Sequence, residues 1–303
     1  MAETPNETTR CGFVALIGAP NAGKSTLLNA LVGAKVAIVT HKVQTTRTRI
    51  TGIGMHENAQ IVFIDTPGIF EPKRRLDRAM VNAAWKGSDD AETTLLLVDA
   101  KKGLTEEVEK IIEGLKRAKR EAILVINKID GMRRDGLLAF VKEMNDAYDF
   151  SETFLISALT GDGVKDLMAH VASLAPEGPW MYPEDQIADV TMRILASEIT
   201  REKIYLRLHD ELPYHTTVET EKWEERKDGS VRIEQVIHVQ RETQKGIVIG
   251  KGGSMLKLLG QMAREEMEKE FGIRVHLFLH VRTTERWAED RTVYKDMGLD
   301  FVD

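Results

Sequence analysis

A glycine-rich loop near the start of the chain carries the residues whose types and spacing could do chemistry. The run from Gly18 to Ser25 reads GAPNAGKS, with Lys24 directly before the terminal serine. Glycines let the backbone curl so that successive amides point at phosphate oxygens, and a helix that starts there adds partial positive charge. Lys24 could reach the outer phosphates, and the Ser25 hydroxyl could bind Mg²⁺. The loop therefore predicts a triphosphate site.

The flanking sequence supplies the two elements that must position such a loop. Residues 11–17 are apolar and partly β-branched, as in a buried strand, and residues 26–32 have helical spacing. A strand, a glycine loop and a helix in this order separate a phosphate site from a chance glycine-rich turn. The expected phosphate contacts are Gly18, Ala19, Pro20, Asn21, Ala22, Gly23, Lys24 and Ser25.

A second polar motif indicates which base is bound. Asn127 to Asp130 reads NKID and follows the apolar residues 122–126, so it falls at the carboxyl end of an expected strand, where open α/β sheets bind ligands. The Asp130 carboxylate can accept N1–H and N2–H of guanine, whereas adenine would leave it unpaired. Asn127 could serve the base N7 or bridge to the glycine loop, and the stem of Lys128 could cover the base. The motif predicts guanine nucleotides and disfavours a P-loop kinase or ATPase.

Three more segments complete the expected site. Asp65 to Gly68 (DTPG) ends a strand pattern, and there Asp65 could hold Mg²⁺ through water while the Gly68 amide bonds the terminal phosphate. The Ala158 amide could donate to guanine O6. One threonine within residues 44–49 could complete the Mg²⁺ shell, with Thr46 favoured over Thr45, although an ordinary polar loop is the alternative. The further expected nucleotide contacts are Asp65, Thr66, Pro67, Gly68, Ile69, Asn127, Lys128, Ile129, Asp130, Ser157 and Ala158; the expected Mg²⁺ ligands are Ser25, Thr46 and Asp65; the expected catalytic groups are Lys24, Thr46 and Gly68.

Ile69 occupies the position at which small GTPases commonly carry a glutamine that orients the attacking water. An isoleucine side chain has no hydrogen-bonding group, so we expect slow intrinsic hydrolysis, with water placed by backbone groups, an ion or a partner. Asn21 could ligate a monovalent cation such as K⁺, which makes K⁺ a candidate cofactor beside GTP, GDP and Mg²⁺. The alternative is that Asn21 only packs the loop.

Composition limits the classes of function that remain. The 303 residues contain one cysteine and carry a formal net charge of −6, so a disulfide framework and bulk attraction to nucleic acid are both disfavoured. The N-terminus is acidic and polar, unlike a signal peptide, and no apolar run is long enough to span a membrane. These features favour a cytoplasmic protein of roughly two domains.

A proline-rich connector marks the expected domain boundary. Pro176, Pro179 and Pro183 cluster there, and before them buried-strand patterns alternate with amphipathic helices at 104–119 and 163–174, as in a doubly wound, mostly parallel α/β sheet. We therefore expect a flexible N-terminus at 1–9, a GTPase domain at 10–175, a linker at 176–186 and an RNA-binding domain at 187–303 with a C-terminal helix.

The pattern after the connector is that of an α+β domain. A helix is expected at 188–199, and two strands at 216–223 and 231–239 are joined by a hairpin at Asp228-Gly229. A helix pair that includes 255–271 and a strand at 273–281 follow, so the expected order is helix, two strands, helix pair, strand. The Gly-x-x-Gly loop at 250–253 precedes the long helix, as in the prokaryotic (type II) version of the KH domain, where a nucleic-acid backbone approaches the loop and single-stranded bases lie in an adjacent apolar groove. The expected RNA contacts are Ile249, Gly250, Lys251, Gly252, Gly253 and Lys257.

Several motifs together resemble one family of translation-factor-related GTPases. QTTRTR at 44–49, DTPG at 65–68 followed by Pro72-Lys73, ELPY at 211–214 and VIGKGG at 248–253 are similar to the Era family of bacterial ribosome-assembly GTPases (TrmE-Era-EngA type), over residues 10 to 300. The resemblance implies a GTP-hydrolysing switch that binds the 3′ end of 16S rRNA and assists assembly of the 30S subunit, with no DNA partner. It also implies a monomer with peripheral contact at the inner membrane.

Two interpretations stay open at this point. The protein could instead be an RNA chaperone in which GTP is structural and hydrolysis incidental. The basic run Lys73-Arg74-Arg75, which follows the phosphate-sensing residues, could contact RNA or protein in one nucleotide state, or could simply be solvated.

Overall fold

The computed structural model of this protein describes residues 8–42, 45–47, 49–209, 211–285, 287–289, 291, 294 and 297–302. The chain forms two compact units. The first contains Met1–Ala37, Thr46–Asp189 and Met297–Asp303, and the second contains Ile38–Thr45 and Val190–Asp296. The expected N-terminal segment at 1–9 falls almost wholly outside the described residues.

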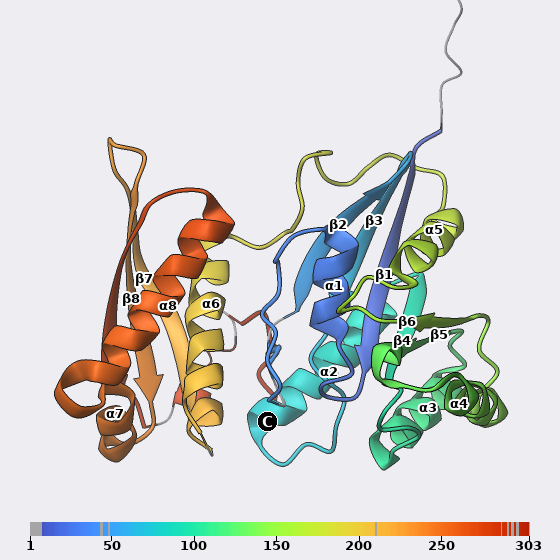
Figure 1. The fold of residues 1–303 in the computed structure, drawn as a ribbon, viewed down its shortest axis with the longest axis horizontal. Coiled ribbons are helices and arrows are strands. Elements are labelled where there is room, and N and C mark those ends of the chain that lie inside the picture. The colour runs from blue at the N-terminus through green and yellow to red at the C-terminus, as the bar shows by residue number, and fades with distance from the viewer. Residues whose placement is uncertain are drawn as a thin grey trace, which may run out of the picture. The chain divides into compact units, whose positions relative to one another are not determined.

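The first unit is a doubly wound α/β fold, which confirms the expected fold class. Its six-stranded sheet has the order β2-β3-β1-β4-β5-β6, with helices on both faces (Figure 1). Among the described strands of this sheet, only the β2–β3 pair is antiparallel. The strands are β1 Arg10–Gly18, β2 Ile50–His56, β3 Ala59–Asp65, β4 Thr93–Asp99, β5 Ile123–Asn127 and β6 Thr153–Ile156. The helices are α1 Lys24–Val32, α2 Arg75–Asp89, α3 Glu106–Ala118, α4 Arg134–Ala147 and α5 Val164–Leu174.

The strands of this sheet are apolar because helices cover both faces. Every residue of β3 and of β5 is buried. One core cluster joins residues of β1, β4 and β5 to apolar positions of α2, α3 and α4. Parallel strands β1, β3 and β5 end at Gly18, Asp65 and Asn127, so three of the expected motifs meet at one edge of the sheet.

In the second unit, helices α6, α7 and α8 pack against a three-stranded sheet of order β7-β8-β9, in which β9 runs parallel to β8. Its elements are α6 Met192–Arg207, β7 Thr216–Glu225, β8 Val231–Val239, α7 Glu242–Ile249, α8 Ser254–Phe271 and β9 Val275–Thr283. This order matches the expected type II KH arrangement. Short 3-10 turns occur at Ile129–Gly131 in the first unit and at Leu212–His215, Lys251–Gly253 and Trp287–Glu289 in the second.

The first helix of this unit lies later than its pattern predicts. We expected a helix at 188–199, whereas α6 begins at Met192 and ends at Arg207. Thr191 fixes the start, because its side chain accepts a hydrogen bond from the amide of Ile194 as an N-cap. The helix continues because residues as far as Tyr205 are buried. The expected C-terminal helix falls largely outside the described residues.

Two segments belong to a different unit from the one that their position in the sequence predicts. Ile38–Thr45 belongs to the second unit and is hydrogen-bonded to α6. Met297–Asp303 belongs to the first unit, where Asp300 pairs with Lys86 of α2 at 3.2 Å and Leu299 is buried. Apart from these two segments, the chain divides after Asp189, whereas the expected RNA-binding domain begins at 187. Within the described residues, no helix has the length and apolarity needed to cross a membrane.

Candidate nucleotide site and RNA groove

The glycine loop is held by the residue that begins the base motif. Asn127 Nδ2 donates to the Ala22 carbonyl at 2.9 Å, which is the bridge expected as one of its two roles. Gly23 has φ 100°, and a Cβ at this position would lie 2.2 Å from Asn127 Nδ2. Only glycine permits both this left-handed backbone and this close approach. The loop and the base motif thus form one rigid site.

Lys24 lies under the loop, and its side chain is 6% exposed. Its Nζ donates to the carbonyl oxygens of Gly18 and Ala19, each at 3.1 Å. Burial lowers the pKa of Lys24 to about 8, while the negative charge of Asp65 acts in the opposite direction. A bound phosphate would favour the charged ammonium, so nucleotide binding and full protonation of Lys24 support each other.

Three oxygen-bearing side chains converge beside Lys24. Ser25 Oγ lies 2.6 Å from Asp65 Oδ2 and 2.8 Å from Thr46 Oγ1, and Thr46 Oγ1 lies 3.4 Å from Asp65 Oδ2. Thr45 is not part of this cluster, because its hydroxyl bonds Thr40 Oγ1 at 2.6 Å and the Lys42 carbonyl at 2.8 Å. The structure thus brings together the three expected Mg²⁺ ligands and places Thr46, rather than Thr45, beside the other two.

The donor set fits Mg²⁺. Asp65 is fully buried, and its second carboxylate oxygen, Oδ1, has no hydrogen-bond partner among the described residues. Burial raises the pKa of Asp65 to about 6, which opposes its charged form, although Lys24 and the two hydroxyls partly compensate. A hard divalent cation that prefers oxygen ligands would satisfy the orphaned oxygen and stabilise the carboxylate. Ser25, Thr46 and Asp65 would then hold the ion, which neutralises charge on the phosphates.

The guanine motif is assembled at the ends of β5 and β6. Ser157 Oγ donates to Asp130 Oδ1 at 2.8 Å and so orients the carboxylate expected to read the base. The amide of Ala158 donates to Asn127 Oδ1 at 3.0 Å, rather than standing free for guanine O6. Lys128 is partly exposed and reaches the Asn21 carbonyl at 2.6 Å, so its stem spans the distance between motif and loop.

The sequence reasoning missed one residue of this site. Asp99, at the end of β4, accepts from Lys128 Nζ at 2.7 Å and is 7% exposed. The ion pair fixes the lysine whose stem is expected to cover the base. The signal was present, because Asp99 ends a buried strand pattern at the same sheet edge as Asn127.

The loop after β3 is set by tight packing on the glycine loop. A Cβ on Gly68 would lie 2.9 Å from Pro20 Cα, and the Ile69 amide donates to the Gly18 carbonyl at 3.1 Å. The Ile69 side chain is 6% exposed and belongs to the core cluster of the first unit. Ile69 therefore contributes its backbone to this region, while its side chain packs into the core. Thr66, expected nearby, donates its hydroxyl to the Leu16 carbonyl at 2.7 Å.

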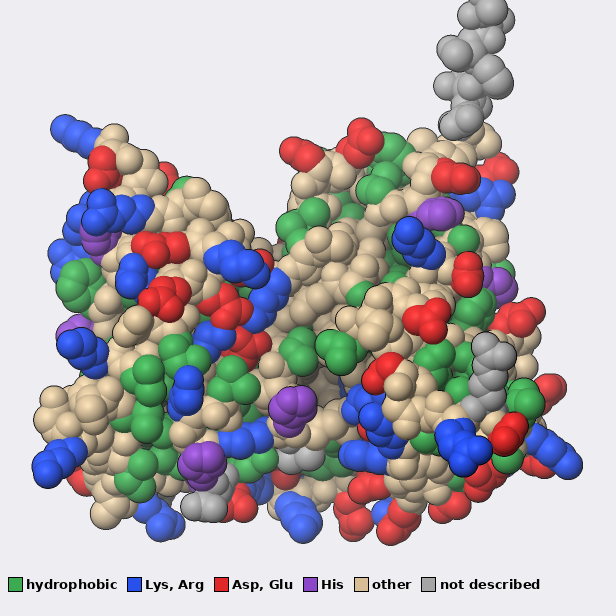
Figure 2. Space-filling model, in the orientation of Figure 1, with side chains coloured by type: hydrophobic (Ala, Val, Ile, Leu, Met, Phe, Trp, Pro, Cys, Tyr) green, Lys and Arg blue, Asp and Glu red, His purple; other side chains and the backbone are tan. Residues whose placement is uncertain are grey.

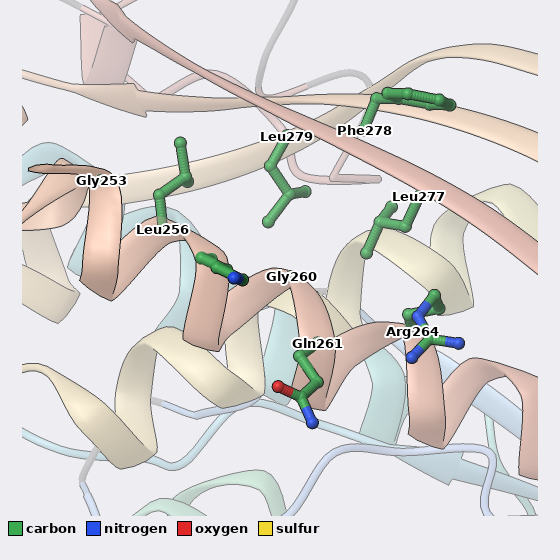
Figure 3. A pocket seen from close by; sticks show the side chains of 9 residues that line it. Gly253, Leu256, Gly260, Gln261, Arg264, Leu277, Phe278 and Leu279 are labelled. Carbon is green, nitrogen blue, oxygen red and sulfur yellow. The ribbon is translucent and has the colours of Figure 1, made fainter.

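A groove of about 560 Å³ lies beside the Gly-x-x-Gly loop in the second unit. Leu256 on α8 and Leu277 and Leu279 on β9 form its apolar walls, with Gln261 and Arg264 of α8 along the rim (Figure 3). Of the expected RNA contacts, Gly253 and Lys257 line the groove. Sequence reasoning did not anticipate Gln261 and Arg264, which follow Lys257 along the same helix.

The Gly-x-x-Gly loop beside this groove has a backbone that a ligand can approach closely. Gly250, Gly252 and Gly253 all have positive φ, at 72°, 59° and 81°, and Lys251 and Gly252 are exposed. Apolar side chains also gather on the visible surface over α7 and α8 (Figure 2). Among the residues of these two helices, Ile247 is 57% and Leu258 37% exposed. A basic residue on an exposed glycine turn beside an apolar groove is a suitable arrangement for a single-stranded nucleic-acid backbone and its bases.

The fold and the two sites define the class of this protein as a P-loop GTPase joined to a KH domain. Residues 13–128 match the family model of the 50S ribosome-binding GTPases, and residues 211–288 match that of the KH domain. GTPase Era of Rhizobium meliloti (strain 1021) is 57% identical over 99% of this chain and 98% of its own length. The chain belongs to the GTPase Era family.

Further comparisons agree across the full length. GTPase Era of Caulobacter vibrioides (strain NA1000 / CB15N) is 58% identical, covering 99% of each chain. A crystal structure of Era in complex with MgGDPNP and nucleotides 1506–1542 of 16S ribosomal RNA matches with a TM-score of 0.91 and 36% identity, over 96% of this chain and 99% of that one. A variant of Aquifex aeolicus Era bound to GDP and AlF4⁻ matches with the same values. The expected GTPase activity and the KH domain are confirmed by these relationships.

Proposed function

We propose that this GTPase is a switch that binds the 3′ end of 16S rRNA through its KH groove and assists assembly of the 30S subunit. The observation that carries the proposal is the exposed Lys251 loop beside an apolar groove of about 560 Å³. The same chain brings the residues expected to bind guanine nucleotide together at one edge of a sheet. The similar Era structure in complex with nucleotides 1506–1542 supports the choice of RNA.

The nucleotide half of the switch rests on the cluster of Ser25, Thr46 and Asp65. Mg²⁺ held there would tie the Thr46 loop to the nucleotide phosphates, and Gly68 would respond to the terminal phosphate from the other side. Lys24 supplies positive charge to the phosphates in a buried site, where such a charge is strongest. Hydrolysis would release the tie on Thr46, and the segment that precedes it belongs to the RNA-binding unit.

Substitution of the exposed loop tests the RNA half. Lys251→Asp with Gly252→Asp places negative charge against the RNA backbone, and aspartate tolerates the left-handed backbone of residue 252 better than most residues. We expect binding of a 16S 3′-end oligonucleotide to fall at least about tenfold, or about 1.4 kcal/mol. GTP hydrolysis should stay near the wild-type rate, since no nucleotide-site residue changes.

A matched control separates loop contact from net charge. Arg226→Gln with Lys227→Asp changes the charge by the same amount at the exposed β7–β8 hairpin, away from the groove residues. This variant should keep its RNA affinity to within about a factor of two to three. RNA binding that survives the loop substitution in a folded protein would remove the RNA half of the proposal.

The rival role, an RNA chaperone with structural GTP, makes a different prediction about turnover. For a switch, 30S subunits should change the rate of GTP hydrolysis, whereas for a chaperone the rate should be the same with and without them.

Binding of K⁺ at Asn21 belongs to the same proposal. Asn21 has φ 63°, and its carbonyl accepts from Lys128. Turnover should fall when K⁺ is replaced by Na⁺, and Asn21→Ala should abolish that difference.

We further propose that the protein acts as a cytoplasmic monomer with peripheral contact to the inner membrane. Cell fractionation tests this part. Protein that partitions between the soluble fraction and membranes, and leaves the membranes in high salt, would support a peripheral contact. Recovery entirely in the soluble fraction at low salt would remove it.

A further inference from the structure

Two non-glycine residues of the nucleotide site have a left-handed backbone. Among the described residues, four non-glycine residues have positive φ, and two of them, Asn21 at 63° and Lys128 at 68°, lie in this site. This backbone region is unfavourable for residues other than glycine, so neighbouring contacts must maintain it. The two residues contact each other, because Lys128 Nζ donates to the Asn21 carbonyl at 2.6 Å. One lysine side chain thus joins the phosphate loop to the base motif.

Asp99 is the second partner of this lysine. It is the last residue of β4 and lies in parallel register with Asn127, the last residue of β5, so it stands directly beside the base motif. Its Oδ2 accepts from Lys128 Nζ at 2.7 Å. Asp99 is 7% exposed, whereas the Lys128 side chain is 35% exposed. A fully exposed ion pair contributes little, but a carboxylate this deeply buried needs a charged partner.

The Asp99 carboxylate is itself held in place. Its Oδ1 accepts from the Lys101 amide at 2.9 Å. The backbone carbonyl of Asp99 accepts from the amides of Lys102 and Gly103 at 3.0 and 3.2 Å. Asp99 therefore presents Oδ2 from a fixed point. A fixed acceptor of this kind can orient the ammonium of Lys128, which stands on a flexible four-carbon stem.

The direction of the Lys128 side chain matters for the base. Its amide donates to Asn127 Oδ1 at 2.8 Å and its Nζ reaches the Asn21 carbonyl, so the aliphatic stem runs between the base motif and the phosphate loop. Lysine stems cover apolar surface while the ammonium keeps its polar partners. We expect a guanine that pairs with Asp130 to lie against this stem. Loss of the Asp99 charge would leave the ammonium to the Asn21 carbonyl and solvent, and the stem could then turn away from the base.

We propose that Asp99 is a positioning residue of the nucleotide site, whose buried carboxylate holds Lys128 against Asn21 so that the lysine stem covers one face of the guanine base. The inference rests on the proposed assignment of Asp130 as the residue that reads the base. Asp99 acts on the face of the base through Lys128, whereas Asp130 acts on its edge. Asp99 therefore sets how tightly a nucleotide binds, and Asp130 sets which base is bound.

Two variants remove the ion pair from its two sides. Asp99→Asn keeps an acceptor for the Lys101 amide but places an uncharged amide against the ammonium. Lys128→Met keeps an unbranched apolar stem and removes the ammonium. The control, Asp89→Asn, breaks a different ion pair of the same unit, in which Asp89 at the end of α2 pairs with Arg120 at 2.6 Å.

Titration of the full-length protein with fluorescent GDP and Mg²⁺ gives a readout besides activity. We expect the Kd to rise about tenfold in Asp99→Asn, at least as much in Lys128→Met, and to stay at the wild-type value in Asp89→Asn. In the Lys128→Met background, adding Asp99→Asn should raise the Kd by less than about twofold, because the two residues act through one contact. In GTP hydrolysis the loss should appear in KM, with kcat changed by less than about threefold. Thermal unfolding establishes that each variant is folded, and Lys128→Met carries the test alone if Asp99→Asn is not.

A second nucleotide distinguishes the two carboxylates. The hypoxanthine base of fluorescent IDP lacks the N2–H donors of guanine but presents the same ring face. Asp99→Asn should therefore weaken GDP and IDP by the same factor, whereas Asp130→Asn should weaken GDP more than IDP.

The outcomes separate this inference from the proposed function. Wild-type GDP affinity in a folded Asp99→Asn or Lys128→Met would overturn the positioning role. A loss from Asp99→Asn that is as large in the Lys128→Met background would also overturn it, because Asp99 would then act by another route. Unequal losses for GDP and IDP in Asp99→Asn would do the same. Unchanged GDP affinity in Asp130→Asn would instead remove the assignment of the base motif on which the inference rests.

Discussion

At the scale of single residues, burial sets the chemistry of the phosphate site. It lowers the pKa of Lys24 to about 8 and raises that of Asp65 to about 6, so the nucleotide-free site disfavours both charges. A nucleotide with Mg²⁺ supplies the opposite charge to each group, and the two charged forms are then favoured together. The site is therefore complementary to the metal and nucleotide as a pair, more than to either one alone.

Base selection depends on Asp130. Asp130→Asn replaces an acceptor of N1–H and N2–H by an amide, which suits the C2 carbonyl of xanthine. We expect GTP binding to weaken by about 2–3 kcal/mol, the value of a charge-assisted pair, with preference shifting toward xanthine nucleotides. Titration calorimetry measures both affinities, with the exposed Asp135→Asn of α4 as control. Unchanged GTP affinity would contradict the assignment.

The glycine loop depends on Gly23 in the same way. Gly23→Ala would place a Cβ 2.2 Å from Asn127 Nδ2 at φ 100°, so the bridge from Asn127 to Ala22 must break. We expect nucleotide affinity to fall at least about tenfold. Gly178→Ala is the control, because its Cβ would meet no described atom within 4 Å. Equal affinities of the two variants, measured by fluorescent nucleotide titration, would count against a rigid link between loop and base motif.

At the scale of elements, the loop after β3 is fixed by a core side chain. Ile69 belongs to the same core cluster as Ile17, Leu96 and Val98, so the residue after Gly68 anchors the phosphate-sensing loop in the hydrophobic core. An isoleucine here cannot orient water, and it can hold the Gly68 amide in place. The Ile69 side chain thus holds the loop in position, and other groups must orient the attacking water during hydrolysis.

Truncation of the Ile69 side chain should lower the free energy of unfolding more than it lowers the rate of GTP hydrolysis. We expect Ile69→Ala to lower the free energy of unfolding of the first unit by about 2–5 kcal/mol and Ile69→Val by about 0.5–1.5 kcal/mol. Turnover per folded molecule should change little in the valine variant. Urea denaturation measures the loss, with Leu138→Ala as control, since Leu138 is 69% exposed. Loss of turnover in a stable Ile69→Val would assign the side chain a direct catalytic part.

At the scale of the whole molecule, each unit has its own hydrophobic core. The cluster around β1, β4 and β5 contains residues of the first unit alone, and the two clusters around α6, α8 and β8 contain residues of the second. Separate cores favour separate unfolding transitions. The two functions can then be perturbed one at a time, which the RNA-loop experiment requires.

Nucleotide should accordingly stabilise one unit only. In differential scanning calorimetry we expect two transitions, and Mg²⁺ with GDP at 100 times its Kd should stabilise one of them by about 2.7 kcal/mol. In the Lys251→Asp, Gly252→Asp double variant, nucleotide should shift the same unfolding transition by the same amount as in the wild type. A single transition that moves as a whole with nucleotide would show that the units unfold as one.

Local sequence pattern determined the elements and most of the site. Strand, glycine loop and helix were predictable because each is specified by neighbouring residues, and the motifs at residues 18–25, 65–68 and 127–130 meet because parallel strands end at one edge. The Gly-x-x-Gly loop and its helix were predictable for the same reason. The start of α6 was placed four residues too early, although the Thr191 cap that fixes it is itself a local signal.

Tertiary structure alone decided which segments support those motifs. The bond between Val39 and Glu202 joins residues 163 positions apart, and the ion pair of Lys128 with Asp99 joins the residue after β5 to the last residue of β4. A local pattern carries no information about such partners, so it does not predict the burial of the charged residues Arg201, Glu202 and Lys203. The sequence determined what the nucleotide site is made of. Contacts between residues distant in the sequence, such as Lys128 with Asp99, decided which partners orient its side chains.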